Sequence, residues 1–477
     1  MISRRNFIKS GSFAVAGLSM SNAYDSVAKG FFSGTGEFVS RRPAPKDRKF
    51  ISRSVEATIT RVKAMIADPE LAWMFENCFP NTLDTTIKHH ASKGVPDTFV
   101  ITGDIDAMWL RDSSAQVWPY LPLVKEDTAL AILVRGLINR QTRCVLIDPY
   151  ANAFNYGPDG SYWETDETQM KPELHERKWE VDSLCYVIRL AHEYWKVSGD
   201  ASPFGEEWAQ AMKLIVKTFR EQQRKDGNGP YSFRRKTTSP HDTAQGAGFG
   251  NPVRPVGLIC SVFRPSDDGA IFPFLIPSNF FAVQSLRQLS AMSDSVLHDK
   301  VFAMECIALA GEVHDALMKY GVADHFEYGK VYAYEADGYG SILFMDDANV
   351  PSLISLPYIA GIDEDDEIYR NTRKLVLSPL NPYFAEGKYR GVGGPHTGRE
   401  MIWPLSYVMR ALTSTDDEEI SYCLRMIKET HAGTGFIHES FHRDDPYKFT
   451  RSWFAWANTI FGELILKIAT ERPYLLG

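Results

Sequence analysis

Segment 102–119, with the sequence TGDIDAMWLRDSSAQVWP, gathers side chains that can bind a sugar. It carries three carboxylates, of which Asp112 is one, next to Arg111 and the indole of Trp109. Flat aromatic faces cover the apolar C–H side of a pyranose, and carboxylate and guanidinium groups hydrogen-bond its hydroxyls. Two interpretations of this segment are about equally supported: a sugar pocket, or a helix start with ordinary core tryptophans.

Two other segments supply the pair of carboxyl groups that glycoside hydrolysis needs. One protonated carboxyl must protonate the leaving oxygen, and one ionised carboxylate must activate water or attack the anomeric carbon. The motif FRPSDDG places Asp267 beside Asp268, so one side chain can point into a cleft while the other binds the scaffold. Alone, this motif favours a solvated turn, which is a frequent structure. Glu439 of HESFH is the candidate for the second carboxylate.

Residues 438–442 also match HExxH, the pattern of zinc peptidases. That site requires a helix that projects both histidines from one face. Glycines precede the segment, DDP follows it, and no third ligand lies at a suitable spacing, so a helix is not expected. We predict a loop that presents Glu439, with the histidines hydrogen-bonded around it, and no metal.

Further polar residues can line the same cleft. Asp346, Asp347 and Asn349 precede a proline-initiated helix, where they can contact sugar hydroxyls or a cation, or cap the helix. His396 lies in a glycine-rich stretch that lacks the Gly-Lys-Ser/Thr of a phosphate loop. That stretch is interpreted as a pocket wall, with a surface turn as the alternative. Arg451 and Trp453 open the last long helix and can reach the cleft too, with a core position as the alternative for Trp453.

Helices must position these groups, because helical periodicity dominates the chain after residue 50. Asp127 and Asp416 are candidate N-caps, and Ser278 follows a proline in the same way. Long polar loops rich in Gly, Pro, Asp, Trp and Tyr separate the helices, which predicts a single all-α toroid with its loops around a pocket at one end. Apolar residues at three-and-four spacing predict helices over 53–67, 127–143, 180–197, 206–225, 278–292, 295–319, 364–377, 401–413, 416–430 and 450–469, with shorter ones near 71–78, 112–120 and 351–358.

Composition excludes several classes of protein. The chain has 477 residues, 44% hydrophobic and 23% charged, which is typical of a globular enzyme and not of a disordered chain. Its formal net charge of −8 gives no general attraction to nucleic acid or an anionic membrane. The six cysteines form no CxxC pair, so neither a zinc ribbon nor a redox motif is indicated.

The N-terminus has the pattern of a twin-arginine export signal. Arg4 and Arg5 precede an apolar pair and a lysine, and a short, weakly apolar run follows over 13–20. This run is too short to span a bilayer, so no permanent membrane anchor is expected. We predict a signal peptide over 1–23 that is a substrate of the twin-arginine export machinery, and a periplasmic or secreted protein. An extended lead-in over 24–50 and a single catalytic domain over 51–477 follow.

Read together, five segments strongly resemble glycoside hydrolase family 125: TGDIDAMWLRDSSAQVWPYL, FRPSDDGAIFPFLIPSNFFA, MDDANVPSLISLPY, GGPHTGREMIWPLS and HESFHRDDPYKFTRSWFAWANTIFGELI. The likeness covers about residues 50–477. It implies an (α/α)6 toroid and an exo-acting α-mannosidase that prefers α-1,6 linkages, inverts the anomeric carbon and needs no metal or other cofactor. Mannose-containing glycans are the implied substrates.

The resemblance also implies roles for single residues. It implies an aspartate as the general acid, for which Asp267 is preferred and Asp268 stays open, and Glu439 as the general base. Arg111 and Asp112 match positions expected to hold the non-reducing sugar, and we expect their loop, with Trp109, to close the pocket. Weaker matches to pocket-lining positions are Asp346, Asp347, Asn349 and His396.

Three other functions remain open at this point. Another inverting α-glycosidase, of glucosidase or trehalase type, would use the same two carboxyls. A glycan-binding protein without activity is disfavoured because both carboxyls are retained, and a zinc peptidase is the third. For the acid we expect a carboxyl kept protonated by partial burial and by its acidic neighbour. For inversion we expect the two carboxyls about 6.5–9.5 Å apart, with room for a water between them.

Overall fold

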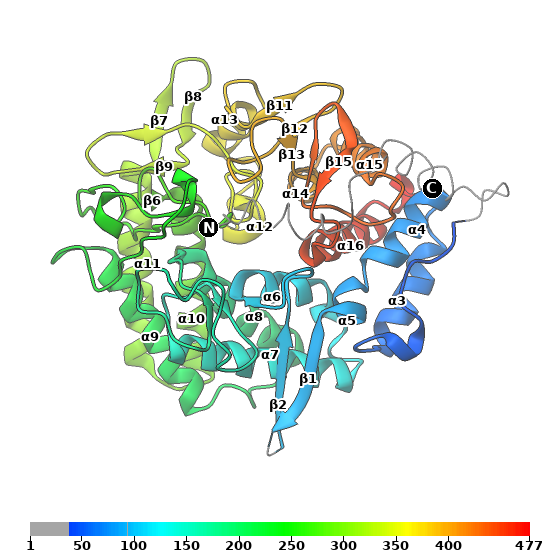
Figure 1. Ribbon diagram of the computed structural model, residues 1–477, viewed down its shortest axis with the longest axis horizontal. Coiled ribbons are helices and arrows are strands. Elements are labelled where there is room, and N and C mark those ends of the chain that lie inside the picture. Colours follow the sequence, from blue (N-terminus) through cyan, green and yellow to red (C-terminus); the bar gives the residue numbers. More distant parts are fainter. Residues whose placement is uncertain (1–37, 93) are drawn as a thin grey trace.

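The computed structural model describes residues 38–92 and 94–477, and its helices form a closed ring (Figure 1). The predicted signal peptide and the first part of the lead-in lie outside the described residues, so export and location stay predictions. The α-helices of the described part are α3 (Arg53–Lys63), α4 (Pro69–Cys78), α5 (Asn81–Thr85), α6 (Leu110–Val117), α7 (Thr128–Ile147), α8 (Val181–Ser198), α9 (Glu206–Gln222), α10 (Ile276–Ser295), α11 (Lys300–Tyr320), α12 (Leu356–Ala360), α13 (Glu367–Val376), α14 (Pro404–Leu412), α15 (Asp417–Thr430) and α16 (Ala455–Glu471).

The helices alternate between an inner and an outer layer. Helices α6, α8, α10, α12, α14 and α16 are buried over most of their residues, as expected where a helix has neighbours on all sides. Helices α7, α9, α11, α13 and α15 bury about one face each, and the α3–α4 pair lies outside α16. This six-fold alternation is the predicted (α/α)6 toroid.

Local sequence sets several helix boundaries. The carboxylate of Asp127 accepts a hydrogen bond from the Leu130 amide at 3.1 Å, and Asp416 caps α15 in the same manner, so both predicted N-caps are confirmed. The prediction for Ser278 is wrong. Helix α10 already begins at Ile276, because Pro277 suits the first turn of a helix, where no amide donor is needed.

Short strands occupy the connections between helices and form six small sheets in the described residues. Several of them lead directly into an inner helix: β3 into α6, β6 into α10 and β13 into α14. The strands are β1 (Ile87–Ser92), β2 (Val95–Val100), β3 (Met108–Trp109), β4 (Ala153–Phe154), β5 (Leu174–Glu176), β6 (Phe274–Leu275), β7 (Val322–His325), β8 (Gly329–Tyr332), β9 (Glu335–Ala336), β10 (Ile342–Leu343), β11 (Phe384–Glu386), β12 (Arg390–Val392), β13 (Met401–Ile402), β14 (Ser440–His442) and β15 (Asp445–Thr450).

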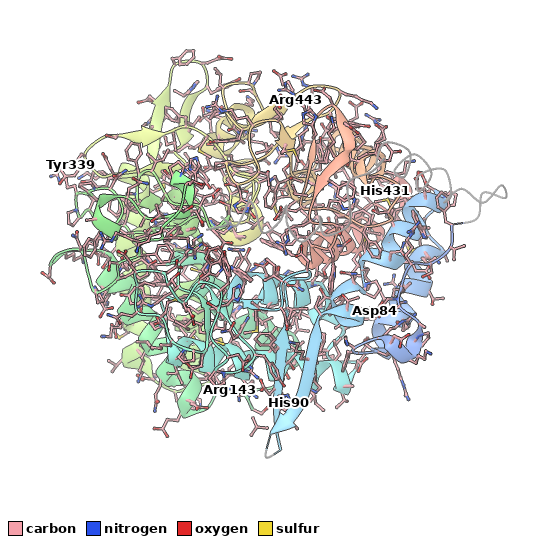
Figure 2. All side chains as sticks on the ribbon, viewed as in Figure 1. Asp84, His90, Arg143, Tyr339, His431 and Arg443 are labelled. Carbon is pink, nitrogen blue, oxygen red and sulfur yellow. The ribbon has the colours of Figure 1, made fainter. Side chains whose placement is uncertain are left out.

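The two ends of the described chain meet and close the ring. Helix α16 packs against α4, α5 and α6, so the last inner helix contacts the first elements of the fold. His431 lies at the end of α15 (Figure 2). Its Nε2 is 3.1 Å from Glu70 Oε1 on α4. Over the residues that the structure describes, no helix has the length and apolarity needed to cross a bilayer.

Candidate active site

A pocket of about 340 Å³, measured with its open mouth, lies where the inner helices begin. Most of its lining comes from the first turns of these helices or from the connections that precede them. Its lining residues are Thr102, Ile105, Trp109, Arg111, Asp112, Pro265, Ser266, Asp267, Asn349, His396, Trp403, Glu439, Arg451 and Phe454. Segments remote in sequence therefore meet at one site, and both preferred catalytic candidates are among them.

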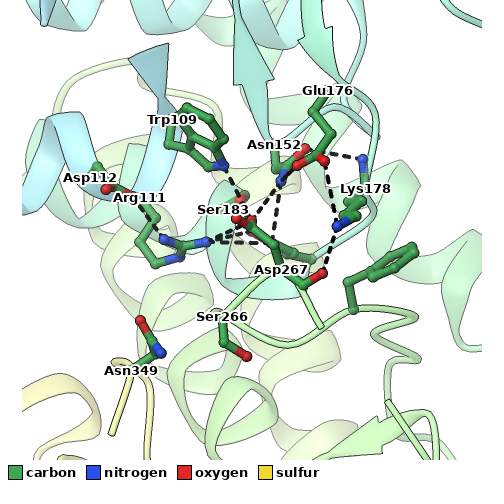
Figure 3. Close-up of polar contacts among 12 residues, drawn as sticks. Trp109, Arg111, Asp112, Asn152, Glu176, Lys178, Ser183, Ser266, Asp267 and Asn349 are labelled. Atoms are coloured by element: carbon green, nitrogen blue, oxygen red, sulfur yellow. Dashed lines mark hydrogen bonds and ion pairs between the residues drawn. The ribbon is translucent and has the colours of Figure 1, made fainter. Parts of the chain in front are cut away.

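Asp267 lies in the connection before α10, and N–H donors surround it (Figure 3). Its Oδ1 accepts from Asn152 Nδ2 at 3.0 Å, from Trp109 Nε1 at 3.2 Å and from Arg111 Nη2 at 3.4 Å. Its backbone carbonyl accepts from the buried Lys178 Nζ at 2.8 Å. These contacts hold Asp267 at a φ of +65°, a left-handed conformation that aspartate tolerates better than most residues.

Arg111 in the first turn of α6 joins four buried carboxyl groups. Its Nη1 contacts Asp112 at 2.7 Å, its Nη2 contacts Glu180 at 3.2 Å and Asp267 at 3.4 Å, and its Nε contacts Asp182 at 3.3 Å. The guanidinium can make these contacts together because its five donors form a rigid plane. Arg111 thus holds these four side chains together at the pocket, and its guanidinium lies 6.0 Å from the ring centre of Trp456.

Glu439 enters the pocket from the segment before β14. Its Oε2 accepts from Thr450 Oγ1 at 2.9 Å, and its Oε1 accepts from Arg451 Nη1 at 3.4 Å. Arg451 is itself held by Asp104, whose Oδ1 lies 2.6 Å from Arg451 Nη2. The carboxylate of Glu439 is therefore oriented by two donors of the segment that opens α16.

Comparison with known proteins decides the family. Residues 68–466 match the family described as metal-independent alpha-mannosidase, GH125. The chain belongs to glycoside hydrolase family 125. The "Meiotically up-regulated gene 157 protein" of Schizosaccharomyces pombe is 44% identical over 456 residues, which are 91% of this chain and 89% of that protein.

Solved structures agree with this assignment. A metal-independent alpha mannosidase of Streptococcus pneumoniae, in a non-productive substrate complex with alpha-1,6-mannobiose, has a TM-score of 0.85 and 39% identity. The match covers 89% of this chain and all of that one. A bacterial glucoamylase complexed with acarbose reaches a TM-score of 0.51 at 11% identity, covering 87% of this chain and 56% of that one. That second likeness supports the toroid fold alone.

In this GH125 protein, the two adjacent aspartates face different surroundings. Asp267 lines the pocket, whereas the Asp268 carboxyl lies 3.3 Å from Nδ1 of His396 and 3.4 Å from the hydroxyl of Ser266. Asp267 also has an acidic neighbour that is remote in sequence, Glu180, which shares the donors Arg111 Nη2 and Asn152 Nδ2 with it. This placement supports the preference for Asp267 as the acid, which stays a prediction.

The polar cluster before α12 divides between the pocket and the scaffold. Asn349 lines the pocket, and Asp347 Oδ1 accepts from its backbone and side-chain amides at 3.0 and 3.1 Å. Asp346 is fully buried and accepts from the amides of Leu353 and Ile354, and burial raises its pKa to about 8. The pocket-lining role expected of Asp346 and Asp347 is therefore corrected: the first caps the turn before α12, and the second orients Asn349.

The HExxH segment is not helical: Glu439 lies at a bend, and the last three residues form β14. The ring of His438 stacks on Phe449 at 3.7 Å between centroids, and burial lowers its pKa to about 4. His442 lies 3.6 Å from Glu400. The expectation that the histidines surround Glu439 is wrong, since its partners come from the following segment.

Four residues that hold the site were missed in the sequence: Asn152, Lys178, Glu180 and Asp182. Asn152 lies just before β4, Lys178 and Glu180 lie just before α8, and Asp182 lies in the first turn of α8. The segment KWEVDSLCYVIRL does contain a usable signal, because acids that begin an otherwise apolar inner helix must have buried partners. Their partner, Arg111, is 69 to 71 residues away in sequence.

Gly103 joins the first and last walls of the pocket. It pairs with Phe454, and the Ala455 amide donates to the Thr102 carbonyl at 3.1 Å. With a φ of +130°, Gly103 lies so close to Trp453 that a Cβ would meet its carbonyl oxygen at 2.3 Å. This position needs glycine for both conformation and space.

Replacing Gly103 by alanine is expected to lower the free energy of unfolding by about 2–3 kcal/mol, because backbone must move at the closure of the ring. Denaturant unfolding measures this change. Gly340→Ala is the matched control: Gly340 has a φ of +115° but no atom within 4 Å of its would-be Cβ. The control isolates the conformational cost, and equal losses in the two variants would contradict a steric role for Gly103.

Proposed function

We propose that this protein is an exo-acting α-mannosidase that releases non-reducing terminal mannose from α-1,6-linked mannosides with inversion. The observation that carries the proposal is the placement of Asp267 and Glu439 on one pocket of a GH125 fold. The alpha-1,6-mannobiose bound by the Streptococcus pneumoniae relative supports the linkage.

In the proposed reaction, Asp267 protonates the glycosidic oxygen as the bond to the anomeric carbon breaks. A sugar alkoxide is a poor leaving group, so this proton is needed in the transition state. The N–H groups of Trp109 and Asn152 orient the Asp267 carboxyl from one side. Asp267 lines the pocket, so its carboxyl can reach the glycosidic oxygen of a bound substrate.

Glu439 acts as the general base in this mechanism. It removes a proton from a water that attacks the anomeric carbon from the face opposite the leaving group. Thr450 and Arg451 hold both of its oxygens, which fixes the direction from which the water is activated. Attack on that face converts an α-mannoside into β-mannose.

Exo action follows from a pocket with a closed floor. We infer that Trp109, Arg111 and Asp112, which line the pocket and are each 4% exposed, form that closed floor. Such a floor binds the hydroxyls of one terminal sugar and leaves no space for a chain to continue beyond it. The rest of the glycan then extends through the mouth.

The test is hydrolysis of α-1,6-, α-1,2- and α-1,3-linked mannobiose by the purified protein, with and without EDTA. We expect the α-1,6 isomer to be cleaved fastest, at a rate that EDTA does not change. Proton NMR of the first minutes should show β-mannose before it mutarotates. Isomaltose and trehalose serve as controls for the glucosidase and trehalase alternatives, and faster cleavage of either would contradict the proposal.

A further inference from the structure

A second carboxyl group, that of Glu180, lies behind the Asp267 carboxyl and takes no part in the mechanism above. Glu180 immediately precedes α8 and its side chain is fully buried. It hydrogen-bonds Asp267, and two of the donors that hold Asp267 also reach Glu180: Arg111 Nη2 at 3.2 Å and Asn152 Nδ2 at 3.3 Å. Ser183 Oγ donates to its Oε2 at 2.9 Å.

Two carboxyl groups in direct hydrogen-bond contact need a proton between them, because a carboxylate is an acceptor only. The surrounding charges point the same way. Arg111 is one cation in contact with four carboxyls, and all four cannot be ionised together in a buried site. Burial raises the pKa of Glu180 well above its ordinary value, and the charges of Asp267 and Asp182 add to this effect, against the lowering effect of Arg111.

The donors around Asp267 and its proposed role as general acid make opposite demands on its protonation state, and the contact with Glu180 can reconcile them. Three N–H donors converge on its Oδ1, and hydrogen bonds of that kind favour the charged form of a carboxyl. A general acid must instead carry a proton when the substrate is bound. Something else in the site has to retain the proton, and the Glu180 carboxyl is in contact with the acid.

We propose that Glu180 is a positioning residue that shares one proton with Asp267 and so keeps the general acid loaded at neutral pH. This inference rests on the proposed function, in which Asp267 is the acid. Asp267 gives the proton of the pair to the glycosidic oxygen, which also receives the electrons of the broken C–O bond. The pair is then doubly ionised beside Arg111, and it takes one proton from solvent after the products leave.

The decisive variant is Glu180→Gln, because glutamine keeps the volume and can still accept from Ser183 and donate to Asp267. Without the carboxylate of Glu180, the N–H donors around Asp267 should stabilise its ionised form. Asp267 should then lose its proton at lower pH. The alkaline limb of kcat/KM for α-1,6-mannobiose is therefore expected to move down by about one to three pH units. The rate at neutral pH should fall about 10–100-fold, whereas 2,4-dinitrophenyl α-mannoside, whose leaving group needs no proton, should lose less than about threefold.

Asp182→Asn is the matched control, since it removes another carboxylate from the same guanidinium but keeps both carboxyls of the Glu180–Asp267 pair. Its alkaline limb should move by less than half as much. An alkaline limb that stays in place in Glu180→Gln overturns the inference, as does an equal loss on both substrates. If Glu180→Gln does not fold, Glu180→Asp replaces it. The shorter side chain moves its carboxylate away from Asp267, so the alkaline limb should move down, but by less than in Glu180→Gln. An alkaline limb that does not move in Glu180→Asp also overturns the inference.

Asp267→Asn separates this inference from the function on which it rests. If Asp267→Asn hydrolyses mannobiose normally, Asp267 is not the acid and the proposed function fails first. If Asp267→Asn shows the loss expected of an acid while Glu180→Gln keeps its alkaline limb, only the role of Glu180 is rejected.

Discussion

Replacement of Glu439 by glutamine should lower kcat on α-1,6-mannobiose about 10³-fold, within the range that general bases contribute. The amide cannot accept a proton from water, but it has the shape of the carboxylate. Its oxygen can still accept from Arg451, and its NH₂ group can donate to the Thr450 hydroxyl. KM should therefore change little, and steady-state kinetics with mannobiose measures both parameters.

Glu400→Gln is the control for this substitution. Glu400 immediately precedes β13 of the same small sheet, but its side chain is 61% exposed and contacts His442 and Arg443 at the surface. Loss of a surface pair of this kind has little energetic effect, so its kinetics should stay within about twofold of the parent. A Glu439→Gln variant that turns over normally removes Glu439 from the role of base and leaves the proposed mechanism without one.

Much of the fold could be predicted because its signal is local. Apolar periodicity located nearly all the long helices, and the N-cap carboxylates of Asp127 and Asp416 fixed two starts. The hairpin of β1 and β2 and the short helix α5 were not predicted. Five or six residues carry too little periodicity, and the hairpin depends on packing of β2 against α7. The order of inner and outer helices depends on similar long-range contacts.

In the candidate site, too, residues with a local sequence signal could be predicted, and residues that depend on long-range contacts were missed. Residues that reach the pocket stand in unusual local sequences, so Trp109, Arg111, Asp267 and Glu439 could be found before the structure. Residues that hold them were missed. The acids at the start of α8 indicate a buried partner, but the sequence does not show that the partner of Glu180 is a guanidinium 69 residues away. Asp346 shows the opposite kind of error, because a residue of the scaffold was expected to line the pocket. An aspartate before a helix suits a sugar site and a helix cap equally well, and only the fold shows which amides donate to it.

Asp267→Asn should produce a loss that depends on the leaving group. On α-1,6-mannobiose the rate is expected to fall about 10³-fold, because the departing sugar alkoxide is no longer protonated. On 2,4-dinitrophenyl α-mannoside, whose leaving group needs no proton, the loss should be less than about tenfold. The fold should tolerate the change: asparagine also adopts a φ near +65°, and its oxygen can accept from Trp109 and Asn152 as the carboxylate does.

Asp268→Asn decides between the two adjacent aspartates. The Asp268 carboxyl contacts His396 beside the pocket, so its replacement should disturb that wall and slow both substrates by a similar factor. A general acid slows only the substrate that needs its proton, whereas a wall residue slows any substrate that binds there. If Asp268→Asn, and not Asp267→Asn, shows the leaving-group-dependent loss, the acid is Asp268, and the proton held beside Glu180 serves the scaffold instead of the reaction.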